Sequence, residues 1–360
     1  MITGHGGNIY ELARQNNCRP DEIIDMSSNL NPLGPPPGLL AYLQQHIAVI
    51  KRLPDAGAAG LIEKFEALHG LSPGRVLAGH GTTEFIYAIT RSLDIKNALI
   101  LGPTYADYRD SCRQNKTRFD FLMAEESTGF SHDTNQIAAA VKNRDMVFVC
   151  NPNNPTGTML PRQSIQELCV SCPNTFFVVD ESYLPFVPEE SHISMIRSDL
   201  ENLIVLTSMS KIFSIPGLRT GFLKASPAVV EQCRNAQVPW NVNSLAQTAV
   251  DYLLSREKEM NLFIQATRDY IQTEMGAFIS RFQEVSAFSL LPGPLPYILI
   301  KNNSHLTADT VCAFLAKDNI LIRNCANFEG LSENYIRVAL KDRSANQLLA
   351  DKLIELVMNP

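Results

Sequence analysis

Short apolar runs alternate with longer helical patterns between residues 75 and 224, and this alternation strongly constrains the fold. Each apolar run is bounded by Gly, Pro, Asn or Asp, which predicts buried strands over residues 75–79, 98–101, 146–150, 176–180, 203–208 and 221–224. Helices are predicted between them over residues 83–93, 105–115, 134–141 and 162–170. Because strands separated by helices pair in parallel and are buried on both faces, we expect an α/β domain with a mostly parallel sheet.

The pattern changes in the last third of the chain. A long helical stretch is predicted over residues 244–282, and a smaller, more open sheet follows with strands at 296–301, 320–323 and 335–340 and helices at 308–316 and 346–358. We therefore expect a large domain over residues 46–250 and a small C-terminal α/β domain over residues 251–360. The segment over residues 1–45 is expected to pack with the small domain and the active site.

Composition and charge argue against nucleic acid, a membrane and a metal ion as partners, and against secretion. The net charge is −6 and there is no long basic run, so we expect neither nucleic acid nor an anionic membrane as a partner. No apolar stretch is long enough for a membrane span, and the first residues do not resemble a signal peptide. The 8 cysteines are irregularly spaced, which favours a reducing cytoplasm over a disulfide framework. The lone C-x-x-C at 169–172 lacks a second ligand pair, so no metal site is expected.

Two turn-rich segments follow predicted strands, where open parallel sheets bind ligands. Gly79-His80-Gly81-Thr82-Thr83 opens a helix, and its glycines would let backbone amides approach a phosphate, although such turns are also common structural features. The Asn-Pro steps of residues 151–157 end the next strand sharply. This second segment is either a tight turn or a device that projects the amide of Asn154 at a ligand.

Two charged residues close predicted buried strands. Asp180 ends an apolar strand, and a buried carboxylate needs a cation, which could be a protonated pyridine nitrogen or an arginine. Lys211 directly follows another strand, and partial desolvation would make its amine nucleophilic, although most lysines are solvated surface residues. Hydroxyl and guanidinium donors that could hold a phosphate lie nearby in the sequence, at Ser208, Ser210 and Arg219.

Taken together, these motifs resemble the fold-type I pyridoxal-phosphate (PLP) aminotransferase superfamily of classes I and II. They are N-P-x-N-P-T-G at 151–157, D-x-x-Y at 180–183, S-x-S-K at 208–211 and G-L-R at 217–219. The resemblance covers essentially the whole chain. It implies a PLP-binding large domain, a small C-terminal domain, and a homodimer with the site at the subunit interface.

The resemblance also implies roles for individual residues. The catalytic set would be Lys211, which carries the cofactor as a Schiff base and moves a proton, with Asp180 on the pyridine nitrogen and Tyr183 on the phenolate oxygen. Asn154 would also bind that oxygen. Tyr105 would stack on the ring, unless it is a core aromatic at a helix start. The phosphate would be surrounded by Gly81, Thr82, Ser208, Ser210 and Arg219.

Further residues would bind the substrate, and they favour one branch of the superfamily. Arg337 matches the arginine that holds the substrate α-carboxylate together with Asn154, although it could also be a solvated strand arginine. His5-Gly6-Gly7, the segment around Asn29 and the segment that begins with Arg323 resemble the threonine-phosphate decarboxylases of cobalamin biosynthesis. His5 and Arg323 would then approach the phosphate of a small phosphorylated amino acid.

Three alternatives stay open. Histidinol-phosphate aminotransferases share most of these motifs, and the two reactions differ only in how the substrate carboxylate is oriented. Leu53 and His80 stand where a tyrosine and an asparagine are usual, so a divergent enzyme acting on serine phosphate is also plausible. A non-catalytic regulator would need a DNA-binding motif, and none precedes His5.

Overall fold

The computed structural model describes residues 6–188 and 190–358, and the chain divides into two compact units. Unit 1 comprises the described residues up to Leu33, the segment Asn154–Gly157 and the chain from Ala266 onward. Unit 2 comprises Gly34–Asn153 and Thr158–Gln265. The long helix α11 (Glu257–Ser280) begins in unit 2 and ends in unit 1.

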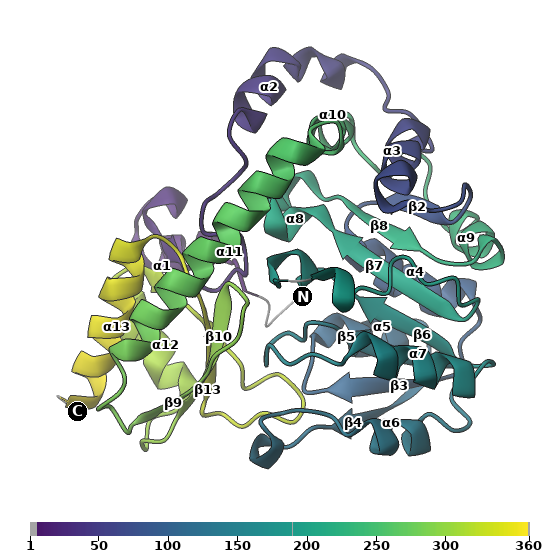
Figure 1. Cartoon of the computed structure of the whole chain (residues 1–360). Coiled ribbons are helices and arrows are strands. Elements are labelled where there is room, and N and C mark those ends of the chain that lie inside the picture. The colour runs from purple at the N-terminus through teal and green to yellow at the C-terminus, as the bar shows by residue number, and fades with distance from the viewer. Residues whose placement is uncertain (1–5, 189, 359–360) are drawn as a thin grey trace. The chain divides into compact units, whose positions relative to one another are not determined.

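Within the described part of unit 2, the strands form one seven-stranded sheet in the order β2-β8-β7-β6-β5-β3-β4 (Figure 1). Among these described strands, only β8 runs antiparallel to its neighbours β2 and β7, so the expectation of a mostly parallel sheet is confirmed. The strands are β2 (Val76–Gly79), β3 (Asn97–Gly102), β4 (Arg118–Met123), β5 (Met146–Cys150), β6 (Phe176–Asp180), β7 (Leu203–Ser208) and β8 (Gly221–Lys224).

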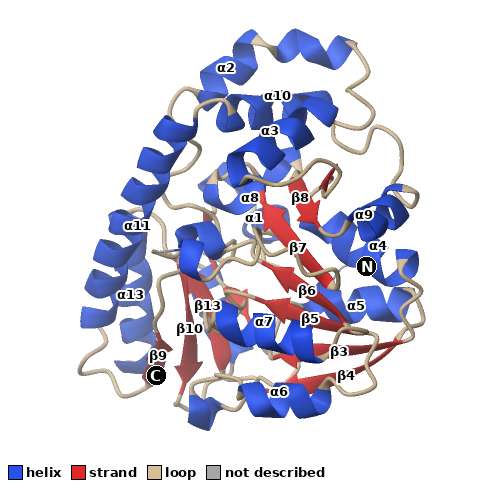
Figure 2. Cartoon of the chain, turned by 45° about the vertical axis from the view of Figure 1, so that its right-hand side comes forward, coloured by secondary structure: helices blue, strands red, loops and turns tan. Residues whose placement is uncertain are grey.

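Helices cover both faces of this sheet, as Figure 2 shows. One face carries α4 (Thr82–Ser92), α5 (Ala106–Gln114) and α9 (Pro227–Arg234), whose apolar side chains share one buried core with β3, β5, β6 and β7. The other face carries α6 (Thr134–Ala140) and α7 (Arg162–Ser171). The remaining helices of unit 2 are α2 (Leu39–Gln45), η2 (Ile47–Lys51), α3 (Ala59–His69), η3 (Glu126–Thr128), η4 (Leu184–Phe186), η5 (Glu190–His192), α8 (Met209–Ile212), η6 (Pro216–Leu218) and α10 (Ser244–Leu254).

The described residues of unit 1 build a four-stranded antiparallel sheet and a separate short parallel pair. The sheet has the order β12-β13-β10-β9, and the pair joins β1 to β11. These strands are β1 (Ile24–Asp25), β9 (Phe288–Leu291), β10 (Tyr297–Asn302), β11 (Ile320–Leu321), β12 (Arg323–Asn324) and β13 (Tyr335–Ala339). The helices are α1 (Ile9–Asn16), η1 (Pro20–Glu22), α12 (Ala308–Ala316), α13 (Arg343–Met358) and the later part of α11.

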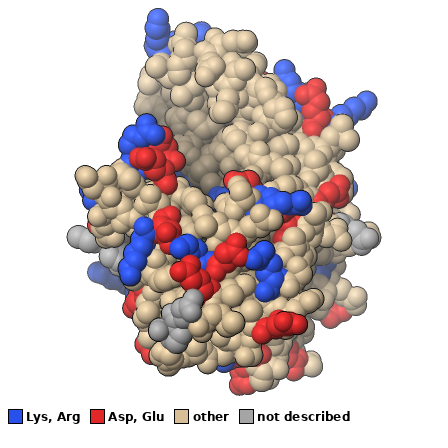
Figure 3. All heavy atoms as spheres, turned by 90° about the vertical axis from the view of Figure 1, so that its left-hand side faces the viewer, with Lys and Arg blue, Asp and Glu red and all other residues tan. Residues whose placement is uncertain are grey.

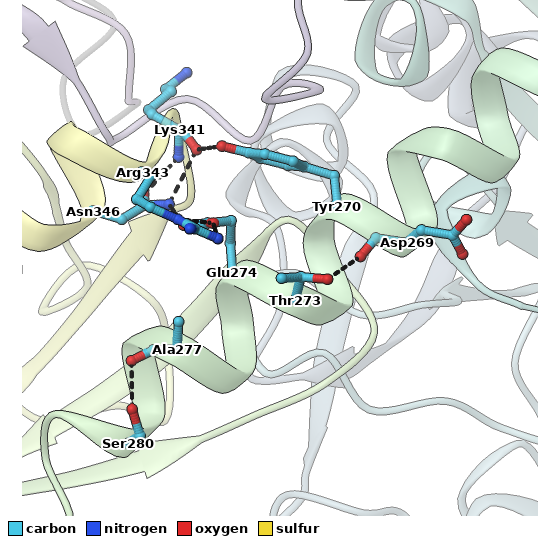
Figure 4. Close-up of polar contacts among 9 residues, drawn as sticks. All are labelled: Asp269, Tyr270, Thr273, Glu274, Ala277, Ser280, Lys341, Arg343 and Asn346. Atoms are coloured by element: carbon cyan, nitrogen blue, oxygen red, sulfur yellow. Dashed lines mark hydrogen bonds and ion pairs between the residues drawn. The ribbon is translucent and has the colours of Figure 1, made fainter.

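A buried carboxylate joins α11 to α13 (Figure 4). The side chain of Glu274 is only 2% exposed and accepts hydrogen bonds from Arg343 Nε at 2.9 Å and Asn346 Nδ2 at 3.0 Å. Tyr270, one turn earlier on α11, donates its hydroxyl to the carbonyl of Lys341 at 3.1 Å. These contacts fix the start of α13 against α11, directly after the strand that carries Arg337.

The strands β1 and β9 and several helices, among them α1, α3 and α9, were not predicted, and three further stretches differ from the expectation. The strand β4 was missed because it lies at the edge of the sheet, where its side chains alternate between charged and aromatic instead of forming an apolar run. The stretch 244–282 is two helices, because α10 ends at Leu254 and α11 begins at Glu257. The predicted strand 320–323 is two short strands, of which β11 pairs with β1 and β12 pairs with β13.

The surface of the described residues shows no concentration of one charge on the face drawn in Figure 3. Lysine and arginine side chains are interspersed there with aspartate and glutamate. No helix among the described residues is long and apolar enough to cross a membrane.

Candidate active site

The carboxyl ends of β6 and β7 place two of the predicted residues at the same edge of the sheet of unit 2. Asp180 is the last residue of β6, and Ser208 is the last residue of β7, which pairs with β6 in parallel. Ser208 also begins α8, because its hydroxyl accepts a hydrogen bond from Ser210 N at 3.3 Å. The short helix α8 therefore presents Lys211 immediately beyond the strand.

Asp180 is buried and its carboxylate is held by donors from two elements. The hydroxyl of Tyr108, on α5, donates to Oδ2 at 2.9 Å. Both the backbone N–H and the hydroxyl of Ser182 donate to Oδ1. Burial raises the pKa of Asp180, whereas the bonds from Ser182 and Tyr108 and the charge of Lys211 lower it. The site thus holds a desolvated carboxylate beside a lysine, which suits a cationic ring nitrogen.

A cradle for an anion lies beside this carboxylate. Gly81 caps α4 with φ 78°, and a Cβ atom there would come within 2.8 Å of the guanidinium of Arg219. Only glycine lets Arg219 approach the open N-terminus of this helix so closely. Thr82, the first residue of α4, lies 3.5 Å from Ser182 through their hydroxyl oxygens, and so connects the cradle to Asp180.

Two predicted tyrosines lie in the same unit. Tyr105 caps α5 and packs edge-on against Tyr108, with ring centroids 5.8 Å apart. Burial, with the neighbouring Asp107 and Tyr183, raises the pKa of Tyr105 well above its usual value, so its hydroxyl is neutral. Tyr183 is itself buried, directly before η4.

The residues of unit 2 fit PLP in both charge and chemistry. PLP needs a lysine amine for covalent attachment, a counter-ion for its pyridine nitrogen and several donors for its phosphate. Lys211 and Asp180 satisfy the first two needs, and the Gly81 cradle with Arg219 satisfies the third. A Cβ atom on Gly221 would also lie 3.0 Å from the backbone N of Thr82, so β8 packs closely under the start of α4.

In unit 1, two of the predicted substrate residues are cross-strand partners. Arg323 on β12 and Arg337 on β13 are paired in register, and both are buried. Like charges directly opposite each other destabilise a sheet, and burial increases that cost. A pair of buried arginines in this position is therefore expected where anionic groups bind.

Arg337 makes contacts that leave part of its guanidinium available. It donates to Asn154 Oδ1 through one terminal nitrogen and to the carbonyl of Ser27 at 2.7 Å through the other, and it lies over the ring of Tyr297. Its buried Nε has no hydrogen-bond partner among the described residues, and none of its contacts there is with a carboxylate. A buried guanidinium of this kind is suited to a bidentate carboxylate.

The other predicted substrate residues are Arg323, Asn29 and His5. Arg323 donates to the carbonyl of Asn324 and to Asn327 Oδ1, both at 2.6 Å, and lies over the ring of Phe328. Asn29 is buried in unit 1. His5 lies outside the described residues.

The sequence did not single out three residues that the structure places in these networks: Tyr108, Ser182 and Ser27. Ser182 lies inside the D-x-x-Y motif, so its neighbourhood was a usable signal. Tyr108 is one helical turn beyond Tyr105, which places it near the site but says nothing of Asp180. Ser27 contacts Arg337 through its backbone carbonyl, which no side-chain pattern can reveal.

Comparison with known proteins places the chain in a family. The model of the family "Aminotransferase class I and II" matches residues 21–353. The threonine-phosphate decarboxylase of Salmonella typhimurium is 31% identical over 96% of this chain and 94% of its own length. The "Adenosylcobalamin biosynthesis bifunctional protein CobDQ" of Leptospira interrogans is 32% identical over 96% of this chain, which spans only 40% of that protein. A histidinol-phosphate aminotransferase of Methanococcus aeolicus is 25% identical over 98% of this chain and 95% of its own length.

Solved structures agree with this placement. The L-threonine-O-3-phosphate decarboxylase of Porphyromonas gingivalis matches with a TM-score of 0.83 and 27% identity, over 94% of this chain and 100% of that one. The histidinol-phosphate aminotransferase of Clostridium acetobutylicum matches with a TM-score of 0.85 and 25% identity over the same shares. The expected fold and the expected cofactor are thereby confirmed. The chain belongs to the class I and II aminotransferase family of fold-type I, PLP-dependent enzymes.

Proposed function

We propose that the chain decarboxylates L-threonine O-3-phosphate to (R)-1-aminopropan-2-yl phosphate and CO₂, as a step of cobalamin biosynthesis. The observation that carries the proposal is the in-register pair of buried arginines, Arg323 and Arg337. The substrate carries two anionic groups, a carboxylate and a phosphate, and a pair of buried cations suits such a molecule. The similarity to decarboxylases that act on this substrate supports the same conclusion.

The chain's own residues have distinct tasks in this reaction. Bound PLP supplies an electron sink for the bond that breaks at the substrate α-carbon. Lys211 holds the cofactor and returns a proton to that carbon, and Asp180 keeps the pyridine nitrogen charged. Arg337, oriented by Asn154, holds the carboxylate, and Arg323 holds the phosphate.

A second candidate is a histidinol-phosphate aminotransferase, because relatives and solved structures of that activity also match. It would use the two arginines differently. Histidinol phosphate has a phosphate but no carboxylate, so Arg337 would bind the carboxylate of the amino-group partner glutamate. Serine phosphate, which would give ethanolamine phosphate, remains a closely related substrate for the decarboxylase.

A substrate panel tests the proposal. Purified, PLP-saturated protein is incubated with threonine phosphate, serine phosphate, or histidinol phosphate with 2-oxoglutarate, and CO₂, amine product and glutamate are measured. We expect CO₂ and 1-aminopropan-2-yl phosphate from threonine phosphate. Formation of glutamate from histidinol phosphate, with no CO₂ from threonine phosphate, would reverse the assignment.

Variants at the arginine pair sharpen this test. Arg337→Lys keeps the charge but loses the planar fork, so kcat/KM should fall by about 10- to 100-fold, the equivalent of one charge-assisted hydrogen bond. Arg19→Ala removes an exposed arginine of the same unit and serves as the control. An Arg337→Lys enzyme as active as the Arg19→Ala control would show that this guanidinium does not bind the substrate.

A further inference from the structure

The orientation of Arg337 depends on a backbone carbonyl from a distant segment of unit 1. Its terminal nitrogen donates to the carbonyl of Ser27 at 2.7 Å, across more than 300 residues of sequence. A carbonyl on a loop can direct a guanidinium only if the loop is itself held in place. The geometry of Ser27 therefore bears on how Arg337 presents its remaining donors.

Asp25 holds the turn that contains this carbonyl. One oxygen, Oδ1, accepts from Ser27 N at 2.9 Å, from Ser27 Oγ at 2.6 Å and from Ser28 N at 3.2 Å. This is an Asx turn closed by a third bond from the serine hydroxyl, and such bonds fix the backbone locally. Among the described residues Asp25 makes no hydrogen bond to Arg337, so any effect of Asp25 on Arg337 passes through Ser27.

Met26, which lies between Asp25 and Ser27, is hydrogen-bonded to both sheets of unit 1. Met26 N donates to the carbonyl of Leu321 at 2.8 Å, and its own carbonyl accepts from Ala339 N at 2.7 Å. Ala339 ends the strand that carries Arg337. The Asp25 turn is therefore anchored to β13 at one point and directs Ser27 back toward Arg337 on the same strand.

The N-terminal glycines close over the same turn. Gly7 N donates to Ser27 Oγ at 2.7 Å, which completes the hydrogen bonding of a hydroxyl that already donates to Asp25. A Cβ atom on Gly6 would lie 2.5 Å from the carbonyl oxygen of Ser27, the atom that accepts from Arg337. Only glycine at position 6 allows the chain to cover this carbonyl without displacing it.

We propose that Asp25 is a positioning residue for Arg337: through Ser27 it fixes the carbonyl that orients the guanidinium, and so governs recognition of the substrate α-carboxylate. The inference rests on the proposed function, in which Arg337 binds that carboxylate. The turn at Asp25 and the cover at Gly6 act on one carbonyl, so disturbing either should affect the same property. That property is discrimination between ligands with and without a carboxylate.

A matched pair of ligands tests this directly. Threonine phosphate and (R)-1-aminopropan-2-yl phosphate differ only in the carboxylate. Their dissociation constants are measured by titration calorimetry with PLP-loaded protein that has been treated with borohydride, which makes the Lys211 linkage unreactive and prevents turnover. The Asp25→Ala substitution should raise the dissociation constant of threonine phosphate by about tenfold, the equivalent of one misaligned hydrogen bond to a charged group. The dissociation constant of (R)-1-aminopropan-2-yl phosphate should stay unchanged.

Further variants separate positioning from general damage. Asp25→Asn keeps an acceptor oxygen for the turn and should restore most of the lost affinity, whereas Gly6→Ala should act like Asp25→Ala. Asp21→Ala, at an exposed aspartate of η1, and Gly276→Ala, where an added Cβ meets nothing within 4 Å, are the controls. Equal weakening of both ligands, or of neither, by Asp25→Ala overturns the proposal.

Failure of the proposed function gives a different result. If the protein binds neither phosphorylated ligand, the pair glutamate and histidinol phosphate is used instead, since only glutamate carries an α-carboxylate. A selective loss of glutamate binding in Asp25→Ala then supports the role of Asp25 and rejects the decarboxylase. A loss without selectivity rejects the role of Asp25 as well.

Discussion

The buried carboxylate of Asp180 shows how single residues set the chemistry of the site. Burial alone would favour its protonated form, which could not balance a charged pyridine nitrogen. The donors from Tyr108 and Ser182 oppose this effect because they bind the ionised form. Tyr108 can do so rigidly, since it is fully buried and stacks on Phe148 with centroids 4.9 Å apart.

We therefore expect Tyr108→Phe to weaken PLP binding while preserving the fold. The variant removes only the hydroxyl, and the ring still packs on Phe148. Loss of a hydrogen bond to a charged group costs about 1.5–3 kcal/mol, so the Kd for PLP should rise by roughly 10- to 100-fold, as measured by cofactor absorbance during titration. Tyr87→Phe, in a partly buried tyrosine that packs against the same core, is the control. Equal Kd values for the two variants would show that Tyr108 does not support Asp180.

Sequence patterns can propose residues at strand ends but not residues that act through space. Asp180 and Lys211 were proposed because a buried strand ends beside each of them, and the carboxyl edge of a parallel sheet is where ligands bind. Tyr108 contacts Asp180 across 72 positions, and Ser27 contacts Arg337 across 310. Neither separation leaves a local pattern, so these contacts required the fold.

At the scale of elements, α11 and α13 are joined by two ionic contacts of different kinds. Glu274 is buried and accepts from Arg343 and Asn346 (Figure 4). Arg281 and Asp351 form the other contact, and both side chains are exposed, at 39% and 59%. Water screens the exposed pair on both sides, so it contributes little, whereas Glu274 is buried even though its partner Arg343 is 63% exposed, so this contact is only partly screened.

Glu274→Ala should accordingly lower the thermal unfolding midpoint of the protein more than Asp351→Ala. The first change removes one acceptor from the buried amide of Asn346, which keeps its bond to the carbonyl of Lys341, and should cost about 1–3 kcal/mol. The second should cost no more than about 1 kcal/mol. Calorimetry on the PLP-loaded protein compares the two, and similar shifts would mean that Glu274 does not join the helices.

Element boundaries were predicted best for the most apolar strands of the large sheet. The central strands β5, β6 and β7 were predicted with their observed bounds because they are apolar and buried on both faces. The break between α10 and α11 contains no glycine or proline, so the helical pattern of the sequence predicted one continuous helix there. The short strands β11 and β12 pair with different partners, a choice set by tertiary contacts.

At the scale of the whole molecule, one segment of unit 2 exposes apolar side chains in close succession. Leu40, Ile47, Ile50 and Leu53 are each at least 50% exposed, although they fall within fourteen positions of α2, η2 and the following turn. Clustered exposed apolar residues mark protein interfaces more often than free surface. Together with the homodimer that the family resemblance implies, this segment is our candidate for the subunit contact.

Light scattering tests that assignment, and we expect the unsubstituted protein to show twice the 40.0 kDa mass of the chain. Leu53→Glu should shift it toward the single-chain mass, because a symmetric interface loses the contact twice, at about 1.5–3 kcal/mol per copy. Val170→Glu, at a 66% exposed position at the end of α7, should leave the mass unchanged. If Leu53→Glu also stays at the doubled mass over a dilution series, the contact lies elsewhere. If the unsubstituted protein itself runs at 40.0 kDa, this apolar segment has a different partner.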